Sequence, residues 1–98
     1  DNTVEMYDLK GRKAESWRGI KTEETIKSLP ELIMIGGKSF WVLRTSIQTL
    51  IFPFEGGEPV TKFEGNKKIR PDSPVTIMDE ISIEVECYDG HKRTVKIK

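Results

Sequence analysis

Residues 81–98 read ISIEVECYDGHKRTVKIK, and this stretch decides the fold class. Apolar and charged residues alternate on both sides of a central Asp-Gly step, the pattern of two half-buried strands joined by a tight turn. If the loop has an odd number of residues, Val85 lies opposite Val95 and Ile83 lies opposite Ile97, all on one face. The stretch therefore predicts an antiparallel hairpin with one buried face.

The requirement for an odd number of loop residues also predicts which residues form the loop of this hairpin. Residues 89–91 would form a three-residue loop, and Glu84 would then lie across from Lys96 on the solvated face. A two-residue Asp-Gly turn, although it is the commoner signal, would place Glu84 opposite Val95 and mix the two faces.

The N-terminal residues carry a weaker form of the same pattern. Val4 and Met6 alternate with charged or polar residues, and the loop 9–11 ends in Gly11, which tolerates left-handed backbone. A return strand over residues 12–17 would complete a second charged hairpin.

Between these two hairpins, one short helix is expected at residues 22–29. Thr22 can cap its first turn, and Glu23 and Glu24 suit the positive N-terminal end of a helix. Pro30 would end it.

The middle of the chain is apolar and predicts a central hairpin. Residues 32–35 and 40–43 are apolar at almost every position, and residues 36–38 form the loop between them. Strands that are apolar on both faces are typical of a sheet that is covered on two sides.

Three more strands are expected after this hairpin. Residues 47–52 form one that ends at Pro53, although a helix from Ser46 fits the same apolar spacing. Residues 60–63 and 75–78 form the others.

The predicted architecture is mainly β: an antiparallel β-sandwich or small, partly open barrel of six to eight strands, with one short helix near residues 22–29. A β-rich α+β fold is the alternative. The 98 residues, 36% of them apolar, are enough for one modest core, so residues 1–98 are interpreted as a single domain, a module of a larger protein.

The composition of the chain limits the classes of function that are plausible. The 16 basic and 16 acidic residues cancel, so no global field attracts nucleic acid, and no stretch is apolar for long enough to predict a membrane span. Cys87 is the only cysteine, which rules out an intrachain disulfide and weakly favours a reducing, cytoplasmic location. We expect neither a metal site nor a cofactor.

Catalytic residues are equally sparse. His91 is the only histidine and lies beside a turn, whereas Cys87 falls on the inner face of the C-terminal hairpin. An inward cysteine is usually a small core residue, so we expect no nucleophile–base pair and no enzyme.

The leading hypothesis is a non-catalytic interaction module that binds a protein partner. The contact would use a sheet edge or the exposed aromatic residues Phe52, Phe54 and Trp41. The competing interpretation is that these aromatic side chains close the core.

The alternative hypothesis is a small nucleic-acid-binding β domain. Its basic residues fall in or beside loops: Lys10, Arg12, Lys13, Lys67, Lys68, Arg70, Lys92 and Arg93. Lysines at turns also protect edge strands from aggregation, and that explanation needs no ligand. Convergence of these loops on one side, near an exposed Trp17, Trp41 or Phe63 that stacks a base, would favour nucleic acid.

Overall fold

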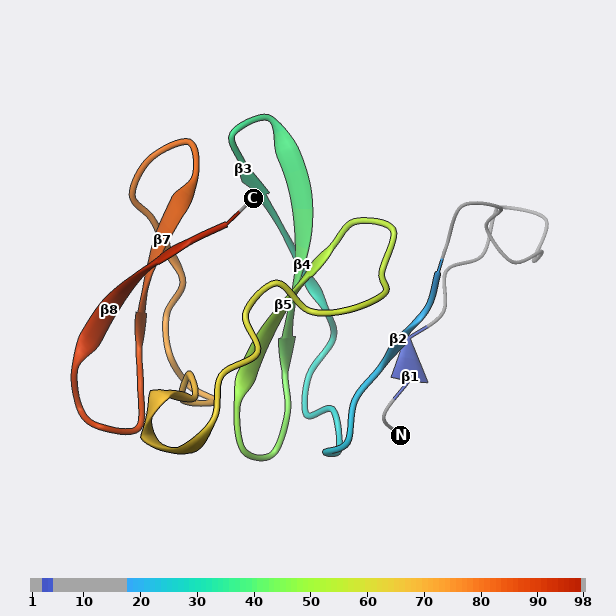
Figure 1. Cartoon of the computed structure of the whole chain (residues 1–98). Helices are drawn as coiled ribbons and strands as arrows, with labels where there is room; N and C mark the ends of the chain where they lie inside the picture. Colours follow the sequence, from blue (N-terminus) through green and yellow to red (C-terminus); the bar gives the residue numbers. More distant parts are fainter. Residues whose placement is uncertain (1–2, 5–17, 98) are drawn as a thin grey trace, which may run out of the picture.

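The computed structural model describes residues 3–4 and 18–97 and has a mainly β, sandwich-like fold. The strands are β1 (Thr3–Val4), β2 (Ile20–Lys21), β3 (Glu31–Ile35), β4 (Lys38–Arg44), β5 (Thr49–Pro53), β6 (Thr76–Ile77), β7 (Ser82–Glu86) and β8 (Lys92–Lys96), with one 3₁₀ turn, η1 (Gly65–Lys67). They form three antiparallel sheets, β1-β2, β3-β4-β5 and β6-β7-β8, which lie side by side in Figure 1. The predicted mainly β class is confirmed, and the strands described do not close into a barrel.

The central hairpin forms as predicted, with a shorter loop. Gly36 and Gly37 have φ values of 58° and 78°, so they make a two-residue turn that side chains would strain. Ile35 pairs with Lys38 directly across this turn, which places Lys38 in β4 rather than in the loop.

Alternation along β4 and β5 divides the central sheet into two buried faces. One face packs against the β6-β7-β8 sheet, and the other packs against the β1-β2 ribbon. The first cluster consists of Ile35, Phe40, Val42, Ile51, Ile69, Ile83, Val85, Cys87 and Ile97. The second consists of Ile20, Leu43, Leu50 and Phe52.

Two-sided burial was predicted for both strands of the central hairpin, and for β3 that prediction is wrong. Leu32 is 53% exposed and Met34 is 63% exposed. Both residues share the face of Trp41 and Leu43, but the β1-β2 ribbon covers that face only over β4 and β5. One side of β3 is therefore open.

The C-terminal hairpin keeps the predicted faces but shifts its register by two residues. Ile83 pairs with Val95, and Glu86 rather than Glu84 faces a lysine, Lys92. Gly90, with a φ of 82°, takes the last loop position, which needs left-handed backbone.

This position of Gly90 also corrects the predicted loop. The amide of Cys87 donates to the carbonyl of His91 (3.0 Å), so the loop is 88–90 rather than 89–91. A shift by two leaves every side chain on its predicted face, and for that reason the buried side was correct while the pairing was not.

The predicted helix at residues 22–29 is absent, which corrects that expectation. Thr22 donates its hydroxyl to the carbonyl of Glu24 (2.6 Å) instead of capping a helix. The main chain here pairs with the end of β4: the amide of Lys27 donates to the carbonyl of Arg44 (2.7 Å). Two turns of helix are only marginally stable, so pairing with the sheet prevails.

Three other expectations can be compared with the structure. The strand over 47–52 is confirmed as β5, and a helix from Ser46 is excluded. Residues 60–63 are irregular rather than a strand, and the strand expected over 75–78 shortens to β6. The N-terminal hairpin predicted over residues 4–17 falls mostly outside the described residues, although Val4 in β1 pairs with Ile20 in β2.

Candidate functional site

The β5 edge of the central sheet is closed by the chain itself. The amide of Thr49 donates to the carbonyl of Ile69 (3.0 Å), and the amide of Ile51 donates to the hydroxyl of Thr61 (2.9 Å). Pro53, the next outward position along β5, has no N–H to offer. No further strand can pair along this edge.

The β3 edge, by contrast, is open. In a two-residue hairpin the residues that flank the turn exchange hydrogen bonds, so Ile35 and Ile33 bond to β4. Leu32 and Met34 then direct their N–H and C=O groups away from β4. Among the residues described, no main-chain group pairs with these outward groups of β3.

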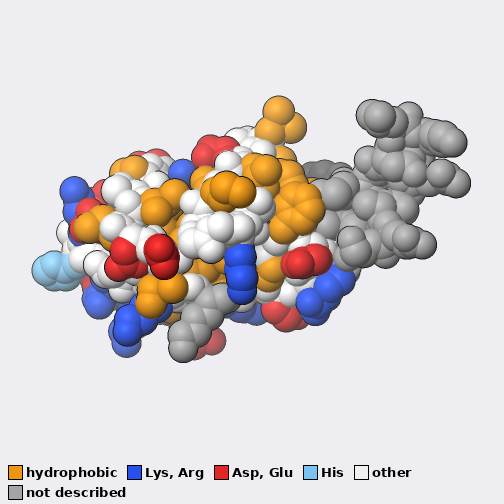
Figure 2. Space-filling view, turned by 90° about the horizontal axis from the view of Figure 1, so that it is seen from above, with side chains coloured by type: hydrophobic (Ala, Val, Ile, Leu, Met, Phe, Trp, Pro, Cys, Tyr) orange, Lys and Arg blue, Asp and Glu red, His pale blue; other side chains and the backbone are white. Residues whose placement is uncertain are grey.

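The side chains at this edge are apolar. Leu32 and Met34 are more than half exposed, and Leu29 just before the strand is 88% exposed. Figure 2 looks down on the end of the molecule that carries the β3–β4 turn and shows hydrophobic side chains reaching the surface there. Neither outward position of β3 carries a charge, although a charge is the usual protection of a free edge.

The β8 edge shows that protection. The amide of Ile97 donates to the carbonyl of Ile81 (2.5 Å), so the odd-numbered residues of this strand bond to β7. The outward positions of β8 are therefore Lys92, Thr94 and Lys96, all exposed. Two lysines at these positions discourage a further strand.

An aromatic pair extends the apolar side of β3. Trp41 lies directly opposite Leu32, and its ring stacks on that of Phe54 at 5.8 Å between centroids and 14° between planes. The Nε1–H of Trp41 also donates to the carbonyl of Phe54 (2.9 Å), which fixes the pair. We call Leu32, Met34, Trp41 and Phe54 together the edge surface.

The aromatic residues predicted for partner binding thus separate into two roles. Phe54 is 43% exposed and Trp41 is partly buried, so both remain accessible. Phe52 is only 1% exposed and belongs to the second core cluster. A buried Phe52 cannot contact a partner, so its proposed role there is withdrawn.

Sequence reasoning did not single out Leu32 and Met34 as exposed residues. Their alternation with Ile33 and Ile35 carries no charge that would mark the exposed side. Only the strand order, with β3 at the edge of its sheet, shows that they are exposed.

Two of the basic loops predicted for nucleic acid lie close together. The amide of Tyr88 donates to the carbonyl of Lys68, and the amide of Asp89 donates to the carbonyl of Asn66, both at 3.1 Å. These bonds bring residues 66–70 against the loop of the C-terminal hairpin. The third basic loop, with Lys10, Arg12 and Lys13, lies outside the described residues.

A groove of about 450 Å³ lies between these loops and β8. Lys67, Arg93 and Lys96 line it around the partly buried Phe63. Arg93 also donates a hydrogen bond to the carboxylate of Asp89. This hydrogen bond is the main cause that raises the pKa of Arg93 and lowers the pKa of Asp89. The groove is therefore cationic, with one of its charges partly neutralised.

The remaining basic candidates point elsewhere. Arg70 lies 3.7 Å from the carboxylate of Asp72 and 6.0 Å from the ring centre of Tyr88. Lys92 lies opposite Glu86, on the other face of the hairpin from Arg93. Lys68 is half-buried beside the loop.

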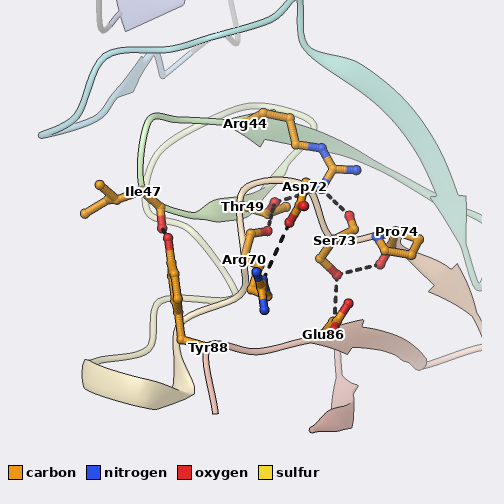
Figure 3. Close-up of polar contacts among 9 residues, drawn as sticks. All are labelled: Arg44, Ile47, Thr49, Arg70, Asp72, Ser73, Pro74, Glu86 and Tyr88. Carbon is orange, nitrogen blue, oxygen red and sulfur yellow. Dashed lines mark hydrogen bonds and ion pairs between the residues drawn. The ribbon is translucent and has the colours of Figure 1, made fainter. Parts of the chain in front are cut away.

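Arg44 and Arg70 take part in a polar seam between the two larger sheets (Figure 3). Arg44 donates to the hydroxyl of Thr49 (2.7 Å) and to the carbonyl of Ser73, and Thr49 donates to the carbonyl of Arg70 (2.8 Å). The hydroxyl of Ser73 accepts the amide of Glu86 (2.8 Å). These contacts satisfy main-chain groups, so we assign the seam a structural role.

Cys87 and His91 do not form a reactive pair. The Cys87 side chain is fully buried in the first core cluster, and burial raises the pKa of its thiol. His91 is exposed beyond the loop and meets Cys87 only through the main chain. A buried neutral thiol is a poor nucleophile.

Two further classes of site can be addressed in the part of the chain that is described. Residues 3–4 and 18–97 contain no group of three histidine, cysteine or acidic side chains placed to hold a metal ion. The same residues contain no helix of the length and apolarity that crossing a membrane requires. Comparison of the chain with protein-family models, with curated proteins and with solved structures finds no match.

Proposed function

We propose that this chain is a non-catalytic interaction module that binds a protein partner by accepting an extended strand along β3. The observation that supports it is the contrast between edges: β5 is closed, β8 carries lysines, and β3 is open and apolar. In strand addition the main chain supplies hydrogen bonds, and alternate side chains supply specificity.

The chemistry of the edge surface suits such a partner. Leu32 and Met34 offer four main-chain hydrogen bonds, each worth about 1 kcal/mol net. Because the free energy of these hydrogen bonds is modest, most of the affinity has to come from burying the exposed side chains. Such burial contributes about 25 cal/mol per Å² of apolar area. The Trp41–Phe54 stack extends this apolar area beyond β3.

A panel of short synthetic peptides with alternating apolar residues tests the proposal. We expect some of them to bind saturably and to slow amide exchange at Leu32 and Met34, measured by NMR. The double variant Leu32→Lys, Met34→Lys should lose this binding, because charged side chains on an edge strand oppose pairing with a further strand. Met78→Lys, at a residue 52% exposed outside the strands, should retain it.

Two results would reject strand addition at β3. One is that no peptide binds. The other is that peptides bind equally well to the lysine double variant, which would place the contact elsewhere on the molecule.

A second candidate function, nucleic-acid binding, is supported by the groove of Lys67, Arg93 and Lys96 around Phe63. Phosphates would lie on the cations, and a base would stack on the ring. Labelled single-stranded and duplex oligonucleotides at low and moderate salt provide the test, because electrostatic binding is strongest at low salt.

Substitution of one lysine in the groove and of one lysine outside it tests this candidate. Lys67→Gln should weaken oligonucleotide binding and lower its salt dependence, whereas Lys38→Gln, at the β3–β4 turn, should change neither. No binding at low salt would eliminate this candidate.

A further inference from the structure

We infer that the strand accepted by β3 is β3 of a second copy of this chain, in antiparallel register about Ile33. This inference rests on the proposed function and names its partner. Two copies would then share one continuous six-stranded sheet in the order β5-β4-β3-β3-β4-β5.

The register follows from which residues face outward. With Ile33 opposite Ile33 of the second copy, Leu32 lies opposite Met34 of the second copy, and Met34 opposite its Leu32. Both are outward-facing positions, so the two pairs exchange four main-chain hydrogen bonds across the axis.

Neighbouring registers do not satisfy this condition. Centring the pair on Leu32 would bring Met34 opposite Pro30, which has no N–H to donate. Centring it on Met34 would bring Leu32 opposite Gly36, which lies in the turn with a φ of 58°. The register about Ile33 is the one that pairs both outward residues within the strand.

The side chains also agree with a two-fold arrangement. The axis runs perpendicular to the sheet, so the exposed Leu32 and Met34 side chains of both copies lie on the same face and cover one another. Glu31 of one copy lies opposite Ile35 of the second copy, which pairs with Lys38 of that second copy. Glu31 and this Lys38 lie on the same face, two strand spacings or about 10 Å apart. No like charges oppose one another across the axis.

The size of the contact predicts a weak dimer. A stable interface buries about 1,200–2,000 Å² in total, and one five-residue strand with its side chains falls short of that. Self-association should therefore depend on concentration, with the monomer prevailing in dilute solution.

A cysteine at the two-fold axis tests the register directly. In this register Ile33 forms a non-hydrogen-bonded pair with itself, with Cα atoms about 4.5 Å apart, which a disulfide can span. Mild oxidation of the Ile33→Cys variant should give a covalent dimer about tenfold faster than oxidation of Leu32→Cys, whose Cα atoms lie farther apart. The unsubstituted chain, with Cys87 buried, is the control.

Sedimentation velocity over a range of concentrations gives an independent measurement. The sedimentation coefficient should rise with concentration for the unsubstituted chain and for Met78→Lys, but not for Met34→Lys. A chain that stays monomeric throughout contradicts the inference, as does Leu32→Cys cross-linking as fast as Ile33→Cys.

The same measurements separate this inference from the proposed function. A monomeric chain that still binds extended peptides with protection of Leu32 and Met34 would overturn the second copy as partner and leave strand addition standing. A monomeric chain that binds no peptide would overturn both.

Discussion

The amide of Thr49 donates a 3.0 Å hydrogen bond to the carbonyl of Ile69, and this contact closes the β5 edge of the central sheet. The chain leaves β5 after Pro53 and has returned to lie along it at Ile69, with Thr61 as a second point of contact. Nothing in the described chain returns to β3 in this way. The asymmetry between the two edges of one sheet is the main structural argument for where a partner binds.

The turn of the central hairpin should be sensitive to substitution at Gly36. A Cβ there would lie far inside van der Waals contact with the carbonyl oxygen of Glu80, and the φ of 58° adds backbone strain. We expect Gly36→Ala to lower the free energy of unfolding by about 2–4 kcal/mol in urea titrations.

Gly37→Ala is the matched control for that variant. Its φ is 78°, but a Cβ there meets no atom within 4 Å, so only the backbone strain of about 1–2 kcal/mol applies. Equal losses for the two variants would show that the turn does not pack against Glu80.

The sequence predicted correctly which face of each strand of the C-terminal hairpin is buried, but it did not predict which residues pair across the hairpin. Alternation placed Ile83, Val85 and Cys87 correctly on the buried side, because the period of two belongs to the strand itself. The register failed at Gly90, where backbone conformation rather than side-chain pattern decides the loop.

The remaining failures are of one physical kind. The helix at 22–29 was predicted from local capping signals, but Lys27 bonds to Arg44, which is remote in the sequence. Likewise, Leu32 is exposed because β3 lies at the edge of its sheet, and Phe52 is buried because the β1-β2 ribbon covers β5. Long-range packing of this kind leaves no local pattern in the sequence.

The hydroxyl of Thr45 should contribute measurably to stability. Thr45 is fully buried, and its Oγ1 accepts the amide of Gln48 (3.1 Å) in the bend between β4 and β5. Thr45→Val keeps the shape but leaves that amide without its acceptor, so we expect a loss of about 1–3 kcal/mol in chemical denaturation. Thr45→Ser restores the acceptor and should recover part of the loss, whereas equal losses would assign the effect to packing alone.

The thiol of Cys87 should resist alkylation in the native protein. It is fully buried, and burial raises its pKa, so the reactive thiolate is scarce near neutral pH. Labelling with iodoacetamide, followed by mass spectrometry, should proceed slowly in buffer and rapidly in denaturant. Rapid labelling of the folded chain would show that the core around Cys87 opens readily.

The contact between Asp89 and Arg93 should make stability depend on pH in acid. The Arg93 hydrogen bond lowers the pKa of Asp89 below its ordinary 3.8 in the folded state. Its stabilising effect is therefore present above that ordinary value and is lost as the pH falls through the lowered pKa. Arg93→Gln should be less stable than the unsubstituted chain at about pH 5 to 7, with the difference narrowing in stronger acid.

Thermal unfolding of both proteins across that range measures the difference. A constant difference at every pH would mean that Arg93 acts by packing and not through the charge of Asp89.

Residue-resolved amide exchange in dilute solution shows whether the edge of β3 is unpaired. We expect rapid exchange at Leu32 and Met34 and slow exchange at Ile33, whose amide bonds to β4. Slow exchange at all three amides under conditions where the chain is monomeric would mean that the edge is already covered and that no partner strand can pair there.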